Sequence, residues 1–390
     1  MDSKSAGAPI PFNLPPRTGN EAARVEQAMR SDRMSGDGPH SRYCESRLQQ
    51  LLSCPRVLLT PSCTDALELA ALLLDVGPDD EVIMPSFTFV STANAFALRG
   101  AKIVFVDIRP DTLNIDERAV EAAITPRTRV IVPVHYAGVG CEMDELNRIA
   151  ERYRIHVVED AAQAIGASYK GRPLGSFGAL AALSFHETKN VTSGGEGGAL
   201  LINDPRLIQR AEILREKGTN RSQFFRGQVD KYTWVDVGSS FLPSELQSAY
   251  LASQLDDLNL INSDRRATWT RYRDELATVA GIRIPSPPEH CAHNAHIFHV
   301  RVRDLSQRDW ALTGLARRGI DAVFHYVPLH STPGAAGRAR FSGVDRFTTA
   351  ESERIIRLPL WFGMPERSVQ HVIESLRELF SGRRVTLPSC

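Results

Sequence analysis

The sequence has few of the features that mark membrane, secreted and metal-binding proteins. Its 390 residues include only six cysteines, with no CxxC pair and no Cys/His spacing typical of a zinc site. The most apolar stretch, residues 67–76, is interrupted by Glu68 and Asp75, whereas a membrane-spanning helix needs about 20 apolar residues. Residues 1–10 lack the apolar core of a signal peptide. We therefore expect no metal centre, no membrane span, reduced cysteines and a cytoplasmic protein.

An excess of charge of either sign is also missing. The 46 Lys and Arg residues equal the 46 Asp and Glu residues, so the formal net charge is zero. Nucleic acids and anionic membranes favour basic surfaces, so neither is an expected partner. A hydrophobic content of 42% and a charged content of 24% are ordinary for a globular fold.

Short apolar segments alternate with helical patterns between residues 57 and 202. We expect strands at 81–84, 102–107, 129–134, 155–159, 182–185 and 199–202, and helices at 64–76, 91–99, 117–124, 143–154 and 205–217. Strands that are apolar on both faces and separated by helices indicate an α/β fold with a mostly parallel sheet covered on both sides.

The rest of the chain predicts a second, smaller unit. A long helix from Glu245 leads into a region with expected strands at 296–302 and 322–326 and helices at 308–318 and 368–380. We predict a large domain over residues 1–255 with an irregular N-terminal arm, a smaller α+β C-terminal domain over 256–380, and a disordered tail over 381–390.

Two residues at predicted strand ends are the candidate catalytic pair. Asp160 ends the apolar segment 155–159, and Lys189 lies between the segment 182–185 and the glycine-rich turn Gly194–Gly198. Ligands bind at the carboxyl ends of parallel strands. A lysine amine can bond covalently to the aldehyde of pyridoxal phosphate, and an aspartate can pair with its ring nitrogen and keep it protonated. The two residues therefore predict a pyridoxal phosphate site.

Other residues are candidates for holding this cofactor. Ser62, Cys63 and Thr64 lie at the start of the helix 64–76, where backbone amides can bind a phosphate. Ser184 is a second candidate phosphate ligand, and Phe89 is placed to stack on the pyridine ring.

Each candidate also has a simpler interpretation. Most lysines are solvated surface groups. Asp160 is suited to cap a helix beginning at Ala161, a role compatible with the first. Gln163 is a candidate to bond the cofactor hydroxyl, but it would lie exposed on the same helix in the alternative interpretation. Residues 62–64 form a plain capping turn in the alternative, and Phe89 belongs to the core.

Motifs of other chemistries are not matched. His186-Glu187 lacks the second histidine of a zinc protease HExxH, because position 190 is Asn. The glycine-rich turn lacks the Lys-Ser/Thr pair of a P-loop, no GxGxxG follows a strand, and no GxSxG is present.

Taken together, these residues resemble the DegT/StrS-type sugar aminotransferases. The family pattern is an acidic residue followed by Ala-Ala-Gln, then Ser-Phe, then Lys, then a Gly-Glu-Gly-Gly turn. It is matched by Asp160–Gln163, Ser184-Phe185, Lys189 and Gly195–Gly198, and the resemblance runs from about residue 10 to residue 380. It implies a fold-type I transferase that depends on pyridoxal phosphate and aminates nucleotide-linked keto-sugars.

The resemblance also implies roles for single residues. Lys189 bonds the cofactor, Asp160 holds the ring nitrogen, Phe89 stacks on the ring, and Ser62–Thr64 and Ser184 hold the phosphate. Many relatives have an asparagine that reaches the cofactor phosphate of the neighbouring subunit. Ser240 stands in that segment here, so it would serve in a homodimer with shared active sites.

The substrates implied by the resemblance are L-glutamate and a dTDP-linked keto-sugar. The segment 218–234 offers Arg221, Arg226 and Lys231 for the diphosphate, and His330 is a candidate sugar contact. A structured loop at a dimer interface is the alternative for this segment.

Two other functions stay open. One is amination of another nucleotide-linked 4-keto sugar, and the other is a non-catalytic sugar-sensing regulator with the same fold. A related branch of dehydratases has histidine at the lysine position, and Lys189 argues against it.

Overall fold

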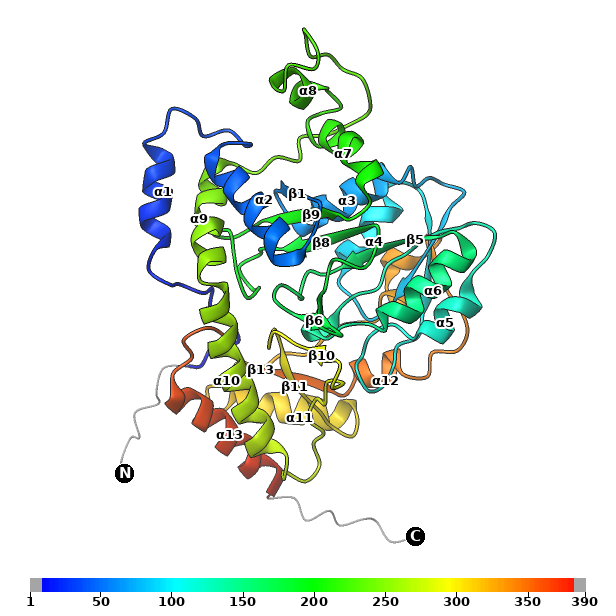
Figure 1. Ribbon diagram of the computed structural model, residues 1–390. Helices are drawn as coiled ribbons and strands as arrows, with labels where there is room; N and C mark the ends of the chain where they lie inside the picture. Colours follow the sequence, from blue (N-terminus) through cyan, green and yellow to red (C-terminus); the bar gives the residue numbers. More distant parts are fainter. Residues whose placement is uncertain (1–8, 382–390) are drawn as a thin grey trace.

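A central sheet of eight strands forms the middle of the larger part of the molecule (Figure 1). In the computed structural model, which describes residues 9–381, the strand order is β1-β9-β8-β5-β4-β2-β3-β12. The bounds are β1 Arg56–Thr60, β2 Glu81–Pro85, β3 Lys102–Val106, β4 Thr128–Ile131, β5 His156–Asp160, β8 Leu180–Ser184, β9 Gly198–Ile202 and β12 Ala339–Phe341. Strand β9 is antiparallel to both neighbours and the other pairs are parallel. The predicted mostly parallel sheet is therefore confirmed.

Helices cover both faces of this sheet (Figure 1). On one face, α2, α5, α6 and α9 contribute residues such as Leu48, Leu146 and Leu251 to one buried cluster. On the other face, α3, α4 and α7 contribute residues such as Leu69, Phe96 and Leu214 to a second cluster. The bounds are α1 Glu21–Met29, α2 Pro39–Leu52, α3 Cys63–Leu73, α4 Val90–Ala97, α5 Glu117–Ala123, α6 Met143–Tyr153, α7 Ile208–Arg215 and α9 Glu245–Asp256.

The two-sided cover explains the apolar strands. Every residue of β2, β8 and β9 is buried. A ligand cannot reach the side chains along these buried strands, so it must contact polar groups at the strand ends.

A smaller unit with its own buried apolar cluster follows α9. Its elements are α10 Leu258–Leu276, β11 Phe298–Arg301, α11 Leu305–Ala316, α12 Thr348–Ser352, β13 Ile355–Leu358 and α13 Glu366–Ser381. Strands β11 and β13 pair in an antiparallel two-stranded sheet, and their apolar side chains pack with those of α10, α11 and α13. The N-terminal segment joins this unit through a backbone bridge between Ile10 and Ile320.

Two expectations for this region are wrong. The segment 322–326 is not a strand, because only Val323 forms a backbone bridge, to Arg357, and the side chain of Tyr326 after it bonds to Gln163. The long helix from Glu245 is two helices, since the chain breaks from helical geometry at Asp257 between α9 and α10. The boundary near residue 255 stays a prediction, and the predicted tail, apart from Ser381, lies outside the described residues.

A small sheet and four short turns lie outside the elements given so far. A three-stranded sheet is built from β6 Ser168–Tyr169, β7 Arg172–Pro173 and β10 Cys291–Ala292. Short 3-10 turns occur at 136–138, 205–207, 329–331 and 333–335. In residues 9–381, no helix is both long and apolar enough to cross a membrane.

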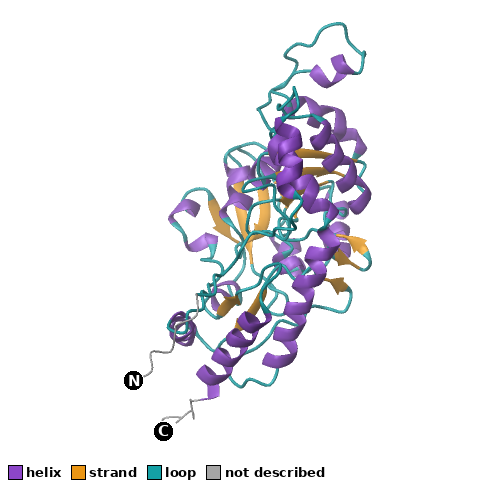
Figure 2. Ribbon diagram, turned by 90° about the vertical axis from the view of Figure 1, so that its left-hand side faces the viewer, coloured by secondary structure: helices purple, strands orange, loops and turns teal. Residues whose placement is uncertain are grey.

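The segment 217–243 differs from the rest of the large unit. Its only helix is the short α8 Arg221–Phe225. Figures 1 and 2 show this segment projecting away from the sheet at one end of the molecule. Several of its apolar side chains are exposed, including Phe225 at 66% and Trp234 at 76%.

Candidate active site

Strands β5 and β8 lie side by side and parallel, so their carboxyl ends meet at one edge of the sheet. Asp160 is the last residue of β5 and Ser184 the last residue of β8. The N-termini of α3 and α4 reach the same edge, where Thr64 Oγ1 of α3 hydrogen bonds to Ser91 Oγ of α4 at 2.8 Å. The sequence-predicted site is therefore assembled from four elements.

The two neighbouring carboxylates Glu159 and Asp160 have different tasks. Successive side chains of a strand point to opposite faces of the sheet. Glu159 is fully buried and accepts hydrogen bonds from the backbone N–H of Gly175, Phe177 and Gly178 and from His135. These bonds hold a loop in place, so Glu159 has a structural role.

Asp160 faces the site. Its Oδ2 accepts a hydrogen bond from Thr92 Oγ1 of α4 at 2.7 Å, and its Oδ1 accepts one from the backbone N–H of Ala162 at 3.1 Å. The second contact caps a turn and not the helix expected in the alternative, because residues 161–167 form turns. The carboxylate is buried, with 6% of the residue exposed, and is fixed in direction before any ligand arrives.

Lys189 is held by the backbone around it. Its N–H donates to the carbonyl of His186 at 2.9 Å. The next residue, Asn190, is buried and bonds to Asn262, the carbonyl of Asn294 and His296. This anchoring fixes where the lysine side chain begins.

The amine of Lys189 has no hydrogen-bond acceptor among residues 9–381. Burial lowers the pKa of this amine, while the negative charge of Asp160 acts in the opposite direction. The amine, the Cys63 thiol and the Asp160 carboxylate are close enough to influence one another electrostatically. A lowered pKa increases the neutral fraction of the amine, the form that attacks an aldehyde.

The glycine-rich turn after Lys189 brings its backbone close to α3. A Cβ atom on Gly198 would lie 2.3 to 2.4 Å from backbone atoms of Ser62 and Cys63. Gly194 and Gly195 have φ values of 87° and 145°, a conformation that favours glycine. The turn therefore needs its glycines both for its shape and for the close packing under the helix start.

The N-terminus of α3 supplies the candidate phosphate site. Ser62 is the N-cap, and its Oγ accepts a hydrogen bond from the N–H of Asp65 at 3.0 Å. The first N–H groups of a helix have no intrahelical acceptor, which leaves those of Cys63 and Thr64 for an anion. Burial raises the pKa of the Cys63 thiol well above its usual range, so the thiol is neutral.

Three further predicted residues lie around Asp160. Phe89 directly precedes α4 and is 58% exposed, so it does not belong to the core as expected in the alternative. Ser184 is buried at the end of β8, and its Oγ accepts only a long bond of 3.4 Å from the N–H of His186. Gln163 is buried rather than exposed, and its amide bonds to the N–H of Ala137 and to the hydroxyl of Tyr326. A contact of Gln163 with a cofactor hydroxyl stays a prediction.

The structure also shows site residues that the sequence argument missed. Thr92 orients Asp160, and Tyr326 orients Gln163. Thr92 lies one turn after Phe89 in an expected helix, so the position of its hydroxyl could have been inferred from helical spacing. Tyr326 comes from a segment 163 residues away from Gln163, and no local pattern signals that contact.

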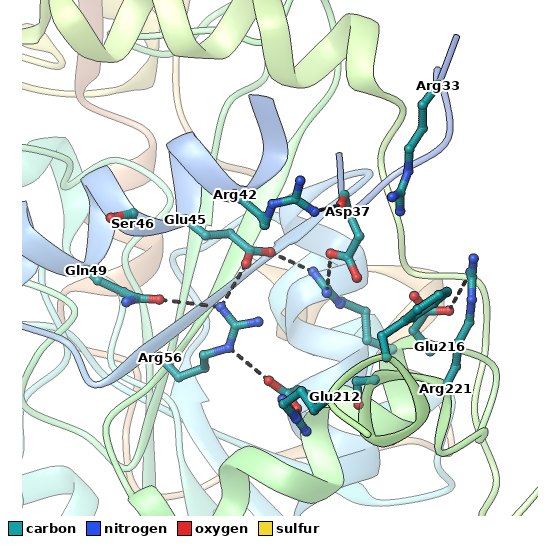
Figure 3. A pocket seen from close by; sticks show the side chains of 14 residues that line it. Arg33, Asp37, Arg42, Glu45, Ser46, Gln49, Arg56, Glu212, Glu216 and Arg221 are labelled. Atoms are coloured by element: carbon teal, nitrogen blue, oxygen red, sulfur yellow. Dashed lines mark hydrogen bonds and ion pairs between the residues drawn. The ribbon is translucent and has the colours of Figure 1, made fainter. Parts of the chain in front are cut away.

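The predicted substrate residues do not gather around Lys189 within one chain. Arg221 pairs with Glu216, Arg226 pairs with Glu212, and Lys231 is exposed in the projecting segment. Arg221 and Arg226 line a cavity of about 520 Å³ between α2, α7 and α8, with Asp37, Glu45, Glu212 and Glu216 among its acidic residues (Figure 3). Their role in binding a diphosphate stays a prediction that requires a second subunit.

Ser240 and His330 also have defined positions. Ser240 is exposed at the base of the projecting segment, where its backbone bridges to Glu216. His330 lies in a 3-10 turn near the carboxyl end of β2; its Nδ1 bonds to Ser86 Oγ at 2.8 Å and its Nε2 faces Asp345 at 3.3 Å.

Pyridoxal phosphate fits the groups at this edge of the sheet. It needs an amine for its aldehyde, a carboxylate for its ring nitrogen and donors for its phosphate. Lys189 has an unpartnered amine, Asp160 a buried and oriented carboxylate, and the first turn of α3 has amide and hydroxyl donors. Within the described residues, no group of three or more His, Cys, Asp or Glu side chains is arranged to hold a metal ion.

A mostly parallel sheet with a lysine and an aspartate at neighbouring strand ends defines the class of fold-type I transferases. Within that class, the chain belongs to the DegT/DnrJ/EryC1/StrS aminotransferase family, which matches residues 16–377. It is a sugar aminotransferase of this pyridoxal phosphate-dependent family.

Solved structures agree with this assignment. The chain is 33% identical to DesV of S. venezuelae, over 96% of this chain and 99% of that one, with a TM-score of 0.87. It is 29% identical to Spr1654 of Streptococcus pneumoniae, a candidate sugar aminotransferase in its PLP form, over 96% and 99%, with a TM-score of 0.87. It is 28% identical to DesI in the presence of its TDP-sugar product, over 96% and 93%, with a TM-score of 0.86.

Proposed function

We propose that the protein transfers the amino group of L-glutamate to C4 of dTDP-4-dehydro-6-deoxy-D-glucose. The products are dTDP-4-amino-4,6-dideoxy-D-galactose and 2-oxoglutarate. The observation that carries the chemistry is the unpartnered amine of Lys189 beside the oriented carboxylate of Asp160.

Two lines support the choice of substrate. The structure of a relative, DesI, was solved in the presence of its TDP-sugar product. Long stretches of this chain, Glu216–Trp234 and His325–His330 among them, resemble the transaminase that makes this 4-amino sugar.

The cofactor, when bound, supplies an electron sink for the carbon that gains or loses the amine. The chain's own residues bind and orient it. Asp160 keeps a negative charge against the ring nitrogen, with its direction set by Thr92. Lys189 is the base that moves a proton to and from the reacting carbon once its amine is free, a role that its lowered pKa suits.

The product's configuration tests this proposal. The purified enzyme is incubated with L-glutamate and dTDP-4-dehydro-6-deoxy-D-glucose, and the product is analysed by NMR. An axial amine at C4, with a small H3–H4 coupling, is expected. A large coupling shows an equatorial amine and replaces the proposed sugar by its C4 epimer. No turnover of any nucleotide-linked keto-sugar, in a preparation that binds pyridoxal phosphate, would favour a sugar-sensing regulator.

A further inference from the structure

The cavity between α2, α7 and α8 is a second candidate site, because none of the residues predicted to hold pyridoxal phosphate lines it (Figure 3). Six arginines and four carboxylates line it, so its walls have an excess of two positive charges. The arginines are Arg33, Arg42, Arg56, Arg215, Arg221 and Arg226. We call it the arginine-rich cavity, and its volume of about 520 Å³ is typical of a site for a small molecule.

The four carboxylates of this cavity are already paired with arginines of the same walls. Arg215, with only 3% of its side chain exposed, lies between Glu45 at 2.7 Å and Asp37 at 2.6 Å. The remaining pairs are Arg56–Glu45, Arg56–Glu212, Arg226–Glu212 and Arg221–Glu216. An anion that enters the cavity therefore meets no unpaired negative charge from these four groups.

Arg33 and Arg42 supply the excess positive charge. Arg33 bonds to described residues only through its backbone, whose N–H and carbonyl both contact the hydroxyl of Ser31. Arg42 donates from Nη1 to the backbone carbonyl of Asp37 at 2.6 Å, and it pairs with no carboxylate of residues 9–381. Figure 3 shows these two arginines on the side of the cavity opposite Glu212. Two guanidinium groups with free N–H donors match the oxygens of a phosphate group.

Two buried polar atoms of the same walls also lack a partner in the described part of the chain. They are Arg215 Nε and Ser222 Oγ. A buried polar atom without a hydrogen bond is costly, so both atoms indicate that a further polar group belongs at this cavity.

An aromatic side chain forms another part of the wall. Phe225 of α8 lines the cavity and is 66% exposed, and Arg221 Cζ lies 5.1 Å from the centre of its ring. Nucleotide bases stack on such rings with little preference for one base. The cavity therefore combines positive charge for phosphate with a surface for a base, whereas inorganic phosphate alone would leave most of its volume empty.

We propose that the arginine-rich cavity binds a nucleotide, with Arg33 and Arg42 bonding its phosphate groups and Phe225 covering its base. The excess of two positive charges matches a phosphate dianion. A nucleotide bound there would join α2 to α8 and so restrain the projecting segment 217–243. The inference goes beyond the proposed function and does not depend on it, because binding can be measured without turnover.

Calorimetry on the enzyme carrying pyridoxal phosphate tests the phosphate contacts, with ADP as the probe. The double variant Arg33→Gln/Arg42→Gln removes the excess charge and leaves the ion pairs of Arg215 intact. It is expected to weaken ADP binding at least about tenfold, since two charge-assisted contacts are lost. Arg118→Gln, which changes an exposed arginine of α5 outside the cavity, is the matched control and should bind ADP as the wild-type enzyme does.

Two further measurements separate the base from the phosphate and this cavity from the catalytic site. Phe225→Leu is expected to weaken ADP binding about tenfold and to leave the binding of inorganic pyrophosphate unchanged. Light scattering checks that this variant assembles like the wild-type enzyme. The KM for the dTDP-sugar is expected to change less than about twofold in Arg33→Gln/Arg42→Gln, since the sugar makes no contact there.

Several results would overturn the inference. They are an absence of ADP binding to the wild-type enzyme, ADP binding that is unchanged in the double variant, and an equal loss in Arg118→Gln. Inorganic pyrophosphate that binds as tightly as ADP would show a site for a simple anion instead of a nucleotide. A KM for the dTDP-sugar that rises in parallel with the loss of ADP binding would assign the cavity to the sugar substrate.

Discussion

At the scale of single residues, the site depends on a few side chains whose directions are fixed by neighbours. Asp160 alone would be one of many buried carboxylates. The hydroxyl of Thr92 and the N–H of Ala162 aim its two oxygens, while Glu159, its neighbour in sequence, is used to hold a loop. The expected role of Asp160 therefore depends on the direction of its carboxylate as well as on its being an aspartate.

Thr92 is expected to act as a positioning residue. Thr92→Val keeps the shape but removes a hydrogen bond to a charged group, which we expect to lower kcat about tenfold. Thr92→Ser retains the hydroxyl and should recover most of the rate. Steady-state kinetics and thermal unfolding of both variants check this. Equal losses of kcat in Thr92→Val and Thr92→Ser would contradict a role of Thr92 through its hydroxyl.

The reactivity of Lys189 should reveal its lowered pKa. Deprotonation makes an amine reactive, so a pKa below the ordinary 10.5 lets Lys189 react with an amine-selective reagent at lower pH. Mass spectrometry of the cofactor-free protein, labelled across a pH series, measures the midpoint. The negative charge of Asp160 opposes the lowering of the Lys189 pKa. Asp160→Asn removes this charge, so the pH midpoint of labelling should be lower still. A midpoint at or above 10.5 would contradict the burial of the amine.

At the scale of elements, the glycine-rich turn and the start of α3 act as one unit. Their backbones approach so closely that a single added carbon has no room. The candidate phosphate site therefore depends on the contact between β9 and α3, and not on either segment alone.

Gly198→Ala tests this contact. The added Cβ would overlap backbone atoms of Ser62 and Cys63, so the turn or the helix start must shift. We expect at least a tenfold loss of pyridoxal phosphate affinity and a loss of stability of about 1–3 kcal/mol. Gly77→Ala, where an added Cβ meets no atom within 4 Å, is the control. Fluorescence titration with the cofactor measures the effect, and equal behaviour of the two variants would refute the account.

At the scale of the whole molecule, a single chain exposes groups that we expect to contact a second subunit. Ser240 is exposed, and the projecting segment 217–243 presents Phe225 and Trp234 to solvent. Exposed apolar side chains of this kind mark interaction surfaces. We expect a homodimer in which this segment reaches the partner's site.

Hybrid dimers test the shared site. Lys189→Ala and Ser240→Asp homodimers are each expected to have little activity, the second because a carboxylate repels the cofactor phosphate. If Ser240 serves the neighbouring subunit, every hybrid has one intact site, and random re-association restores about a quarter of wild-type activity. If Ser240 serves its own chain, mixing restores nothing. Light scattering of the wild-type protein checks the dimer itself.

Much of the site could be predicted because it follows local sequence. Strand ends, a helix start and a glycine-rich turn are set by apolar runs and backbone preferences, and these placed Lys189, Asp160, Ser184 and residues 62–64. The segment 322–326 was assigned wrongly, because its apolar and aromatic residues are suited to a strand but serve a tertiary cluster.

The sequence by itself determined the α/β pattern and the mostly parallel sheet, and it predicted Lys189 and Asp160 as the catalytic pair, since each depends on periodicity and on residues near one another along the chain. Only the tertiary structure decided that Thr92 orients Asp160 and that Gln163 is buried against Tyr326. Those relations join residues 68 and 163 positions apart in the numbering, and packing alone brings such residues together.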